Sequence, residues 1–215
     1  MAALGAYWAF ALFGSAGDWE WTRGWICYAL YGGGTLVMTL IVRRKQPGLM
    51  EERAKMRRPD TKPFDKLFFA IFLPLMLLLP VVAGCDYRYQ GPTMPDWLLW
   101  PGAAISVAGT ALVTWTLSVN RHAESTVRIQ TDRGHTVVTG GPYRYVRHPM
   151  YVGIILSYLA APLILGSWWS FAVSGSIAMA LIWRTVNEDA TLQRELPGYR
   201  DFARRTPYRL LPGLW

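Results

Sequence analysis

Residues 134–153 read GHTVVTGGPYRYVRHPMYVG, and the interpretation of the whole chain depends on this stretch. It opens as a glycine-rich polar loop that carries two histidines, two arginines and three tyrosines. It then runs directly into a long segment without charged residues. Pro149 suits the first turn of a helix, where the missing N–H of proline costs nothing. We therefore expect a polar loop at the mouth of an apolar helix, and we expect it to bind a small charged cofactor.

Long charge-free runs lie on both sides of this stretch. The chain is 52% hydrophobic and only 17% charged, which is more apolar than an ordinary soluble domain. A bilayer core of about 30 Å is crossed by about 20 apolar helical residues. The runs 24–42, 67–85 and 97–120 each fit one crossing. The longer run 149–183 fits a tight hairpin of two short helices that turns near its middle.

The pattern predicts an all-α integral membrane protein with about five transmembrane helices and a C-terminal helical hairpin. Residues 1–17 are a candidate for a short sixth span or for a helix that lies in the interface. We expect one structural domain with two parts. Residues 1–120 hold membrane helices and a cytoplasmic amphipathic connection, in which Glu51–Arg58 form a surface helix. Residues 121–215 form the catalytic region, with the cofactor loop, the hairpin and a C-terminal amphipathic helix.

The basic residues predict the orientation. Of 22 Lys and Arg, nine lie in 43–66, five in 121–147 and six in 184–209. These three segments fall on one face of the threaded membrane, and the positive-inside rule makes that face cytoplasmic. The net charge of +8 is then explained by topology and by attraction to anionic lipid headgroups. We expect a protein of the inner or cell membrane with no nucleic-acid partner.

Two polar clusters flank the hairpin. One runs from His135 to Tyr151, and the other from Arg184 to Glu195. Because an antiparallel hairpin returns its end to its beginning, His148 should lie beside the segment 184–189. The sequence thus predicts a pocket at the cytoplasmic membrane edge that is made from both clusters.

The residue types in this pocket indicate its ligand. Arg184 can hold a carboxylate, and Glu188 can accept hydrogen bonds from an ammonium group or from ribose hydroxyls. The rings of Tyr143, Tyr145 and Tyr151 offer faces to a purine or a cation. This inventory fits a zwitterionic, cationic nucleoside such as S-adenosylmethionine. It fits a nucleotide phosphate less well, because the chain has no G-x-x-x-x-G-K-[ST] loop.

Several charged residues have a simpler interpretation. Glu188 and Asp189 are consecutive on a helix and do not share a face, so we expect one to face the pocket and the other to pair with a basic loop residue. Arg144 and Arg147 are interpreted as anchors that face phospholipids, and His122 as a residue at the membrane edge. The histidines at 122, 135 and 148 have no recognised metal-ligand spacing, and no metal site is expected.

The motif also resembles a known family. Residues 147–153, RHPMYVG, with the preceding GPYRYV of 141–146, resemble the R-H-P-x-Y-x-G signature of isoprenylcysteine carboxyl methyltransferases and their phospholipid-methyltransferase relatives. The resemblance covers 121–215 closely and the first 120 residues only as membrane spans. In that family an acidic pair follows the hairpin. Here the pair is Glu188-Asp189 where the family usually has Glu-Glu, which leaves the role of Asp189 open.

The resemblance implies an integral membrane methyltransferase that binds S-adenosylmethionine. The family's cofactor contacts would map onto these positions: His135, Val137, Val138, Tyr143, His148, Tyr151 and Glu188. Its pocket arginine would map onto Arg184, and we expect Arg184 and Glu188 to be the catalytic residues. In the carboxyl methyltransferases a lipid acceptor enters sideways from the bilayer.

The reaction expected from the sequence is methyl transfer to a lipophilic acceptor, which could be an isoprenylcysteine-like carboxylate. No separate general base is evident, which favours an anionic acceptor over an amine. Three alternatives stay open: a phospholipid amine N-methyltransferase, an NADPH-dependent membrane reductase, and a non-enzymatic transporter or scaffold. A transporter is disfavoured because the charge-free runs hold no ionisable residue at mid-bilayer.

Overall fold

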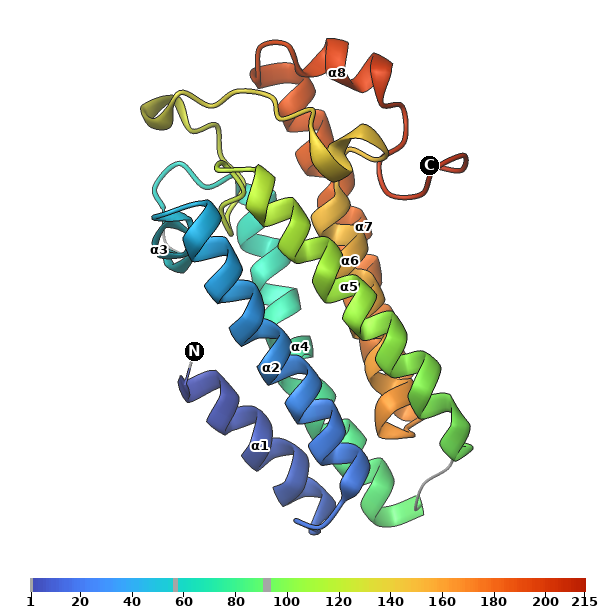
Figure 1. Cartoon of the computed structure of the whole chain (residues 1–215). Helices are drawn as coiled ribbons and strands as arrows, with labels where there is room; N and C mark the ends of the chain where they lie inside the picture. Colours follow the sequence, from blue (N-terminus) through green and yellow to red (C-terminus); the bar gives the residue numbers. More distant parts are fainter. Residues whose placement is uncertain (1, 56–57, 91–93) are drawn as a thin grey trace.

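A computed structural model describes residues 2–55, 58–90 and 94–215. These residues form a bundle of α-helices joined by turns and three short 3-10 helices (Figure 1). The elements are α1 Ala2–Ala16, α2 Thr22–Lys45, α3 Leu49–Ala54, α4 Pro63–Gln90, η1 Asp96–Leu98, α5 Leu99–Val119, η2 Thr131–Arg133, η3 Gly141–Arg144, α6 Pro149–Leu165, α7 Trp169–Glu195 and α8 Tyr199–Arg205. The expectation of an all-helical architecture is thus confirmed for the described chain.

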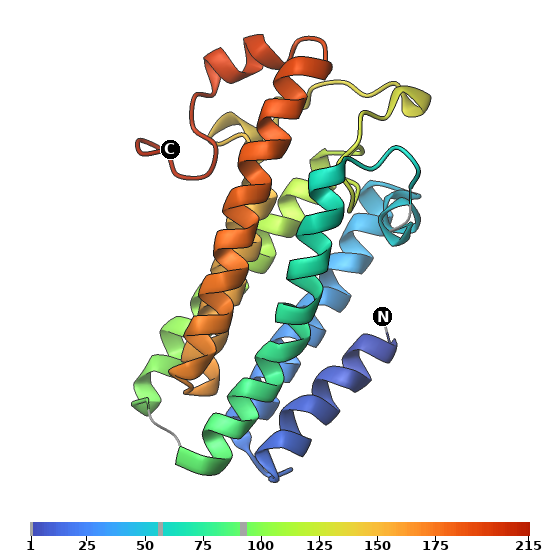
Figure 2. The same cartoon turned by 180° about the vertical axis from the view of Figure 1, so that it is seen from behind.

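The long helices run side by side along one axis. Helix α5 packs along α6 and α2, while α4 packs along α7 and α1; Figure 2 shows α4 and α7 from behind. Three segments are long and apolar enough to cross a membrane: α2, α4 and the continuous stretch Asp96–Val119. Helices α1 and α6 are apolar but shorter. The predicted spans at 24–42, 67–85 and 97–120 are therefore confirmed as membrane-length helices, and the total of about five stays a prediction.

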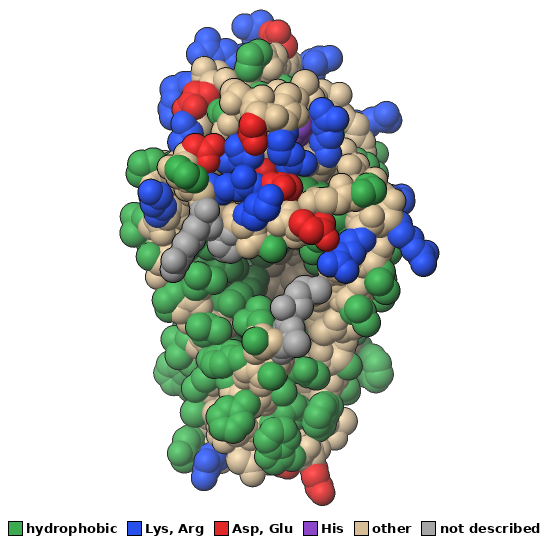
Figure 3. Space-filling view, turned by 90° about the vertical axis from the view of Figure 1, so that its left-hand side faces the viewer, with side chains coloured by type: hydrophobic (Ala, Val, Ile, Leu, Met, Phe, Trp, Pro, Cys, Tyr) green, Lys and Arg blue, Asp and Glu red, His purple; other side chains and the backbone are tan. Residues whose placement is uncertain are grey.

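Charged side chains gather at one end of the bundle. Figure 3 shows Lys, Arg, Asp and Glu in a band at the end where α3 and α8 lie, above a largely hydrophobic surface. We call this the polar end. Helix α1 does not reach it, because its N-terminal end lies beside the middle of α2 (Figure 1). At 15 residues and about 1.5 Å per residue, α1 is too short to cross a bilayer core.

A pair of glycines allows α5 and α6 to approach closely. A Cβ atom on Gly153 would lie 2.6 Å from the carbonyl oxygen of Gly109, and a Cβ on Gly109 would lie 2.6 Å from that of Gly153. Small residues at helix contacts give this kind of approach in membrane proteins. The glycine of the RHPMYVG motif is therefore a packing residue that fixes the start of α6 against α5.

The predicted hairpin is formed by α6 and α7. Gly166 ends α6 with a φ of 77°, a left-handed conformation that glycine adopts without strain. Buried Arg23 donates from Nε to the carbonyl oxygen of Ile164 (2.8 Å) and from Nη2 to that of Leu163 (2.7 Å), so it caps the last turn of α6. Helix α7 runs unbroken to Glu195. It is longer than the short second helix that was expected for the hairpin 149–183, and its C-terminal turns reach the polar end.

Two other boundaries differ from the sequence-based expectation. Helix α4 continues to Gln90, whereas the run predicted to cross the membrane ends at residue 85. The expected helix Glu51–Arg58 is observed as α3, Leu49–Ala54, and residues 56–57 of that prediction lie outside the described residues. Leu49 anchors α3 because its side chain is fully buried against Val42 and Leu117.

Candidate functional site

The two polar clusters meet at the polar end, as the hairpin topology predicts. His148 Nε2 lies 3.2 Å from Asp189 Oδ1, although 41 residues separate them in the chain. Between the clusters lies a cavity of about 90 Å³. Eight residues that the sequence singled out for the site line it: His135, Val137, Val138, Tyr143, His148, Tyr151, Arg184 and Glu188. The structure thus brings the predicted site residues together.

Glu188 faces this cavity. Its carboxylate accepts a hydrogen bond from the hydroxyl of Tyr151, which lies in the first turn of α6. The ring of Tyr151 stacks on the imidazole of His148 with 5.8 Å between the centroids and 7° between the planes. The motif residues and the acidic residue of α7 therefore form one continuous wall.

Asp189 points away from the cavity into a fully bonded cluster. Arg147 donates to both of its oxygens at 2.7 and 3.0 Å, and the hydroxyl of Tyr199 donates at 2.9 Å. Arg209 Nε adds a contact at 3.1 Å. Burial would raise the pKa of Asp189, but the hydrogen bonds from His148 and Arg147 outweigh it and hold the pKa below its ordinary value. Asp189 stays ionised and ties the RHP stretch to α7 and to the C-terminal segment.

This cluster confirms one expectation and corrects another. Of the two consecutive acidic residues, Glu188 faces the cavity and Asp189 pairs with a basic loop residue, as predicted. The prediction that Arg147 faces phospholipids is wrong: its side chain is 6% exposed and bound to Asp189 and to the carbonyl oxygens of Thr206 and Pro207. Arginine in this position satisfies a buried carboxylate with its planar fork of donors.

Arg184 is also paired, with a residue that the sequence did not indicate. Its Nη2 lies 2.8 Å from Oδ1 of Asp65 in α4, at ion-pair distance but without hydrogen-bond alignment, since Oδ1 has no hydrogen-bond partner among the described residues. Asp65 Oδ2 accepts the backbone N–H of Val127 at 2.7 Å. Arg184 Nη2 donates to the carbonyl oxygen of Ser125 at 2.6 Å. The pair therefore joins α4, α7 and the loop that follows α5.

Aromatic rings enclose the guanidinium of Arg184. Its Cζ atom lies 4.4 Å from the ring centroid of Phe68, 5.1 Å from that of Phe69 and 5.4 Å from that of Tyr151. Such cation–π contacts are stronger where water is excluded. The charge of Arg184 is thus held in place by one carboxylate and three rings.

Residues 121–139 form the outer wall of the cavity. His122, expected at the membrane edge, is instead buried, and its ring centroid lies 4.7 Å from that of His135. Burial lowers the pKa of both imidazoles, that of His135 to about 4. Both rings are therefore neutral near pH 7, and each combines one N–H donor with one acceptor nitrogen.

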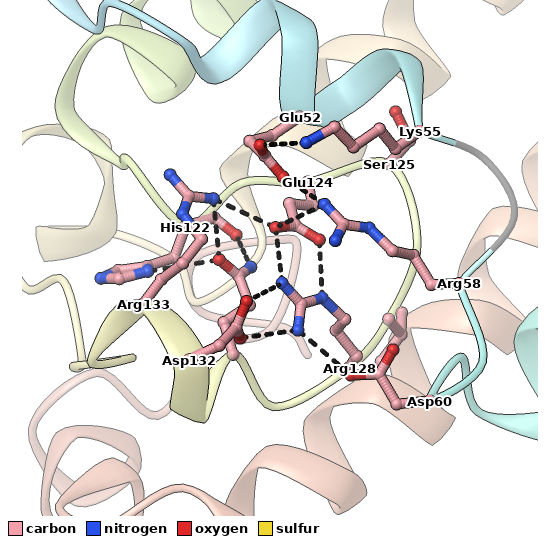
Figure 4. A network of polar contacts seen from close by, with 12 residues as sticks. Glu52, Lys55, Arg58, Asp60, His122, Glu124, Ser125, Arg128, Asp132 and Arg133 are labelled. Carbon is pink, nitrogen blue, oxygen red and sulfur yellow. Dashed lines mark hydrogen bonds and ion pairs between the residues drawn. The ribbon is translucent and has the colours of Figure 1, made fainter.

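An ion network holds this wall against the segment that follows α3 (Figure 4). Glu124 is buried between three arginines: Arg128 Nε lies 2.9 Å away, Arg133 Nη1 3.0 Å and Arg58 Nη2 3.7 Å. Arg128 also contacts Asp132 at 2.8 Å, and its pKa is raised by the hydrogen bonds to these acidic groups. The network thus joins two segments that lie far apart in the sequence.

The tyrosines of the motif divide between the cavity and the surface. Tyr143 lines the cavity, and its hydroxyl accepts a hydrogen bond from Nδ2 of Asn120 at 2.6 Å. Burial raises the pKa of Tyr143, so it stays a neutral phenol. Tyr145, expected to offer a ring face to the ligand, is 62% exposed and does not line the cavity. Arg144 is exposed as well, which fits the anchor that was expected there.

The part of the chain that forms the cavity is similar in sequence to known proteins. Residues 97–197 match the family model described as phospholipid methyltransferase. The chain is 38% identical over 77 residues to the cobalt-zinc-cadmium resistance protein CzcN of Cupriavidus metallidurans, a match that covers 35% of each chain. It is 33% identical over 110 residues to the nickel-cobalt-cadmium resistance protein NccN of Alcaligenes xylosoxydans xylosoxydans, which covers 50% of each chain. The chain thus matches between about a third and half of the length of these curated relatives.

The family match covers α5, the cavity wall 121–139, the RHP stretch and both helices of the hairpin. It leaves out α1 to α4, which contribute Asp65 and the segment bound by the ion network. The apolar helices and the family together describe an integral membrane protein. The segment 97–197 is thus similar to the phospholipid methyltransferase family, which is part of the superfamily of membrane methyltransferases that resemble isoprenylcysteine carboxyl methyltransferases.

Proposed function

We propose that the protein transfers a methyl group from S-adenosylmethionine to a lipophilic acceptor at the polar end of the bundle. The observation that carries this proposal is the convergence of His148, Tyr151 and Glu188 on one cavity wall, inside the segment that matches a methyltransferase family. The band of basic residues at this end supports a site that faces the cytoplasm, by the positive-inside rule. A cell or inner membrane location goes with that orientation.

The chemistry of the cavity fits the cofactor. Glu188 offers a carboxylate to an ammonium or to ribose hydroxyls, and the rings of Tyr143 and Tyr151 offer faces to a purine or a sulfonium. Two further polar atoms of the lining, Thr126 Oγ1 and Arg184 Nε, are buried and make no hydrogen bond within the described chain. Buried polar groups in native proteins almost always have a partner, so these atoms are suited to a polar ligand.

The size of the cavity implies motion of its wall. Sites for ligands of this size measure about 300 Å³ or more, whereas the cavity encloses about 90 Å³. The wall 121–139 must therefore move outward when a nucleoside enters. Part of its attachment to the rest of the chain is polar, because Glu124 lies 3.7 Å from Arg58 and Arg128 lies 3.1 Å from Asp60. The contacts between α6 and α7 need not change.

Each predicted residue has a proposed role. S-adenosylmethionine, when bound, supplies a methyl group activated on a sulfonium. His135, Val137, Val138 and Tyr143 would hold the nucleoside from the outer wall, while His148 and Tyr151 would hold it from the base of α6. Asp189 fixes the ring of His148 through Nε2. Catalysis would depend mainly on proximity and alignment, which can be worth effective molarities of about 10⁵ M or more.

The pairing of Arg184 changes the expectation for the acceptor. The sequence favoured an isoprenylcysteine-like carboxylate held by Arg184, but that charge is already opposed by Asp65 at 2.8 Å. Two carboxylates, Asp65 and Glu188, thus lie close to the proposed reaction site. This arrangement favours a lipophilic amine, in agreement with the phospholipid methyltransferase match. Glu188 would take the proton that an ammonium must lose before methylation. Arg184 would influence the electrostatic environment of Glu188.

Two measurements test the proposal. S-adenosylhomocysteine should raise the melting temperature of the purified protein in detergent, and NADPH should leave it unchanged. A shift with NADPH alone would replace the methyltransferase with a membrane reductase. Labelled S-adenosylmethionine incubated with the protein and a native membrane extract should then label a lipid. Mass spectrometry of that product identifies the acceptor and shows whether oxygen, sulfur or nitrogen is methylated.

A further inference from the structure

Arg53 in α3 lies against the cavity although the family match does not include it. Its Nη1 donates to the carbonyl oxygen of Ala123 at 2.6 Å and contacts that of Glu124 at 3.4 Å. The same atom lies 3.7 Å from the sulfur of Met150. All three of these neighbours line the cavity. The short surface helix α3 thus directs a partly exposed guanidinium toward residues that line the site.

The charge of Arg53 is not matched by an acid. Each of the four buried arginines of the described chain forms an ion pair with a carboxylate: Arg23 with Asp96, Arg128 with Glu124, Arg147 with Asp189 and Arg184 with Asp65. Arg53 has no carboxylate within 4 Å among the described residues and meets only carbonyl oxygens and a thioether. Removing a cation from water without an anionic partner is costly.

The surroundings of Arg53 add to this imbalance. Burial lowers its pKa; the phenol of Tyr151 opposes that effect, and the positive charge of Arg184 lowers the pKa further. Arg184 brings its own counterion, Asp65, so Arg53 is left as the uncompensated cation beside the two tyrosines Tyr143 and Tyr151. An anion at this point would offset both the burial and the repulsion.

We propose that Arg53 binds the anionic oxygen group, carboxylate or phosphate, of a ligand that occupies the cavity. The proposal rests on the proposed function only in that the cavity holds a ligand. The group has two possible sources. It is either the carboxylate of the cofactor or an anionic headgroup of the lipophilic acceptor, and arginine recognises both by charge-assisted hydrogen bonds.

A purely structural role is the alternative to be distinguished. Arg53 also fastens the wall 121–139, since Ser125 Oγ donates to its backbone carbonyl oxygen at 2.8 Å and its own side chain donates to Ala123. Loss of the side chain could then weaken every ligand by loosening the wall. An anion receptor would weaken only ligands that carry the anionic group.

The test compares Arg53→Gln and Arg53→Lys with wild-type protein in phosphatidylcholine nanodiscs. Arg44→Gln is the matched control, because it removes an exposed arginine at the same end of the bundle. The dissociation constants to be measured are those of S-adenosylhomocysteine and of its analogue without the carboxylate, 5′-deoxy-5′-(3-aminopropylthio)adenosine. If the cofactor is the source, Arg53→Gln binds S-adenosylhomocysteine about ten- to a hundredfold more weakly. It binds the analogue as wild type does, and Arg53→Lys recovers most of the loss.

A second arm uses dodecyl phosphate and dodecyltrimethylammonium, which share one alkyl chain. If the acceptor is the source, Arg53→Gln loses about ten- to a hundredfold in affinity for dodecyl phosphate alone. The inference is overturned if Arg53→Gln weakens the binding of neither anion, or if it weakens the two ligands that lack an anionic group equally. It is also overturned if wild-type protein binds neither anion. Arg53-dependent binding of dodecyl phosphate without binding of S-adenosylhomocysteine would refute the proposed methyltransferase while leaving this inference intact.

Discussion

Helix α7 presents two different faces at the polar end. On one face, Asp189 is fully buried and bound to Arg147, His148 and Tyr199. On the other face, Arg184 and Glu188 are one helical turn apart, and both line the cavity. Glu188 is partly exposed, with the hydroxyl of Tyr151 as its partner.

The difference separates a scaffold face from the face proposed to bind the ligand. A buried carboxylate that meets several donors cannot move without leaving charges unpaired, and this fixes the geometry around it. A carboxylate with one neutral partner keeps lone pairs for a ligand. The consecutive acidic residues Glu188 and Asp189 of α7 therefore differ in role, and Asp189 stabilises the scaffold. Four substitutions test this difference between the two faces, and they follow in order of their expected effect on stability.

The largest loss of stability is expected for Asp189→Asn. Removing this charge leaves the buried guanidinium of Arg147 without its counterion, which typically costs about 3–5 kcal/mol. The melting temperature in detergent should fall steeply, and S-adenosylhomocysteine should no longer bind. Asp201→Asn is the matched control, since Asp201 pairs with Arg204 on the exposed side of α8. A melting temperature close to wild type in both variants would remove Asp189 from the scaffold.

A smaller loss is expected for Asp65→Asn. The change leaves Arg184 uncompensated, but the three aromatic rings and the carbonyl oxygen of Ser125 still hold the guanidinium. We expect a cost of about 1–3 kcal/mol, measured by chemical or thermal unfolding. If the acceptor were a carboxylate, this variant should bind it more tightly. Weaker binding of an amine acceptor, with cofactor affinity retained, would support the amine.

The pH dependence of stability is expected to involve His135. Burial lowers its pKa to about 4 from an ordinary 6.5, and its Nδ1 accepts the backbone N–H of Gln130. Above pH 6.5 neither the folded nor the unfolded state binds this proton. Between about 6.5 and 4 only the unfolded state does, so stability falls as the pH is lowered through that range.

Melting temperatures of wild type and His135→Gln at pH 7 and pH 5 measure this effect. The wild type should lose more than the variant on acidification. An equal loss in both proteins would show that His135 does not contribute.

The smallest change in stability is expected for Glu188→Gln. The amide keeps an acceptor for the hydroxyl of Tyr151, and the residue is only partly buried, so unfolding should change by less than about 1 kcal/mol. Affinity for S-adenosylhomocysteine should nevertheless fall about ten- to a hundredfold, because a charge-assisted contact is lost. Calorimetric titration measures it, with Glu195→Gln on the same helix as the control. Unchanged affinity in Glu188→Gln would reverse the roles assigned to the two faces.

The sequence predicted the parts of the site that lie on either side of one hairpin. Because α6 and α7 are antiparallel and consecutive, the juxtaposition of His148 with residues 184–189 follows from topology alone. The motif supplied the remaining wall, including His135 and Tyr143. The binding partner of Arg147 could not be predicted in this way. An arginine next to an apolar helix has the same local sequence whether it faces lipid or a buried carboxylate.

The sequence did not indicate the residues that depend on distant contacts. Asp65 lies 119 positions before Arg184 and Arg53 lies 97 positions before Met150, and no periodic pattern connects such pairs. His122 and Glu124 lie in a segment without regular structure, where side-chain direction has no period to reveal it. An acidic residue in the first turn of a helix whose middle is apolar, as Asp65 is in α4, was the available signal.

Hydrogen–deuterium exchange with and without S-adenosylhomocysteine locates the proposed cofactor site. Binding should slow exchange in the cavity wall 121–139 and in the turns of α7 around residue 188. Exchange in α1 and in the turn between α6 and α7, at the opposite end of the bundle, should stay unchanged. Protection confined to other segments, or no protection at a saturating concentration, would contradict a cofactor site between the RHP stretch and the face of α7 that carries Arg184 and Glu188.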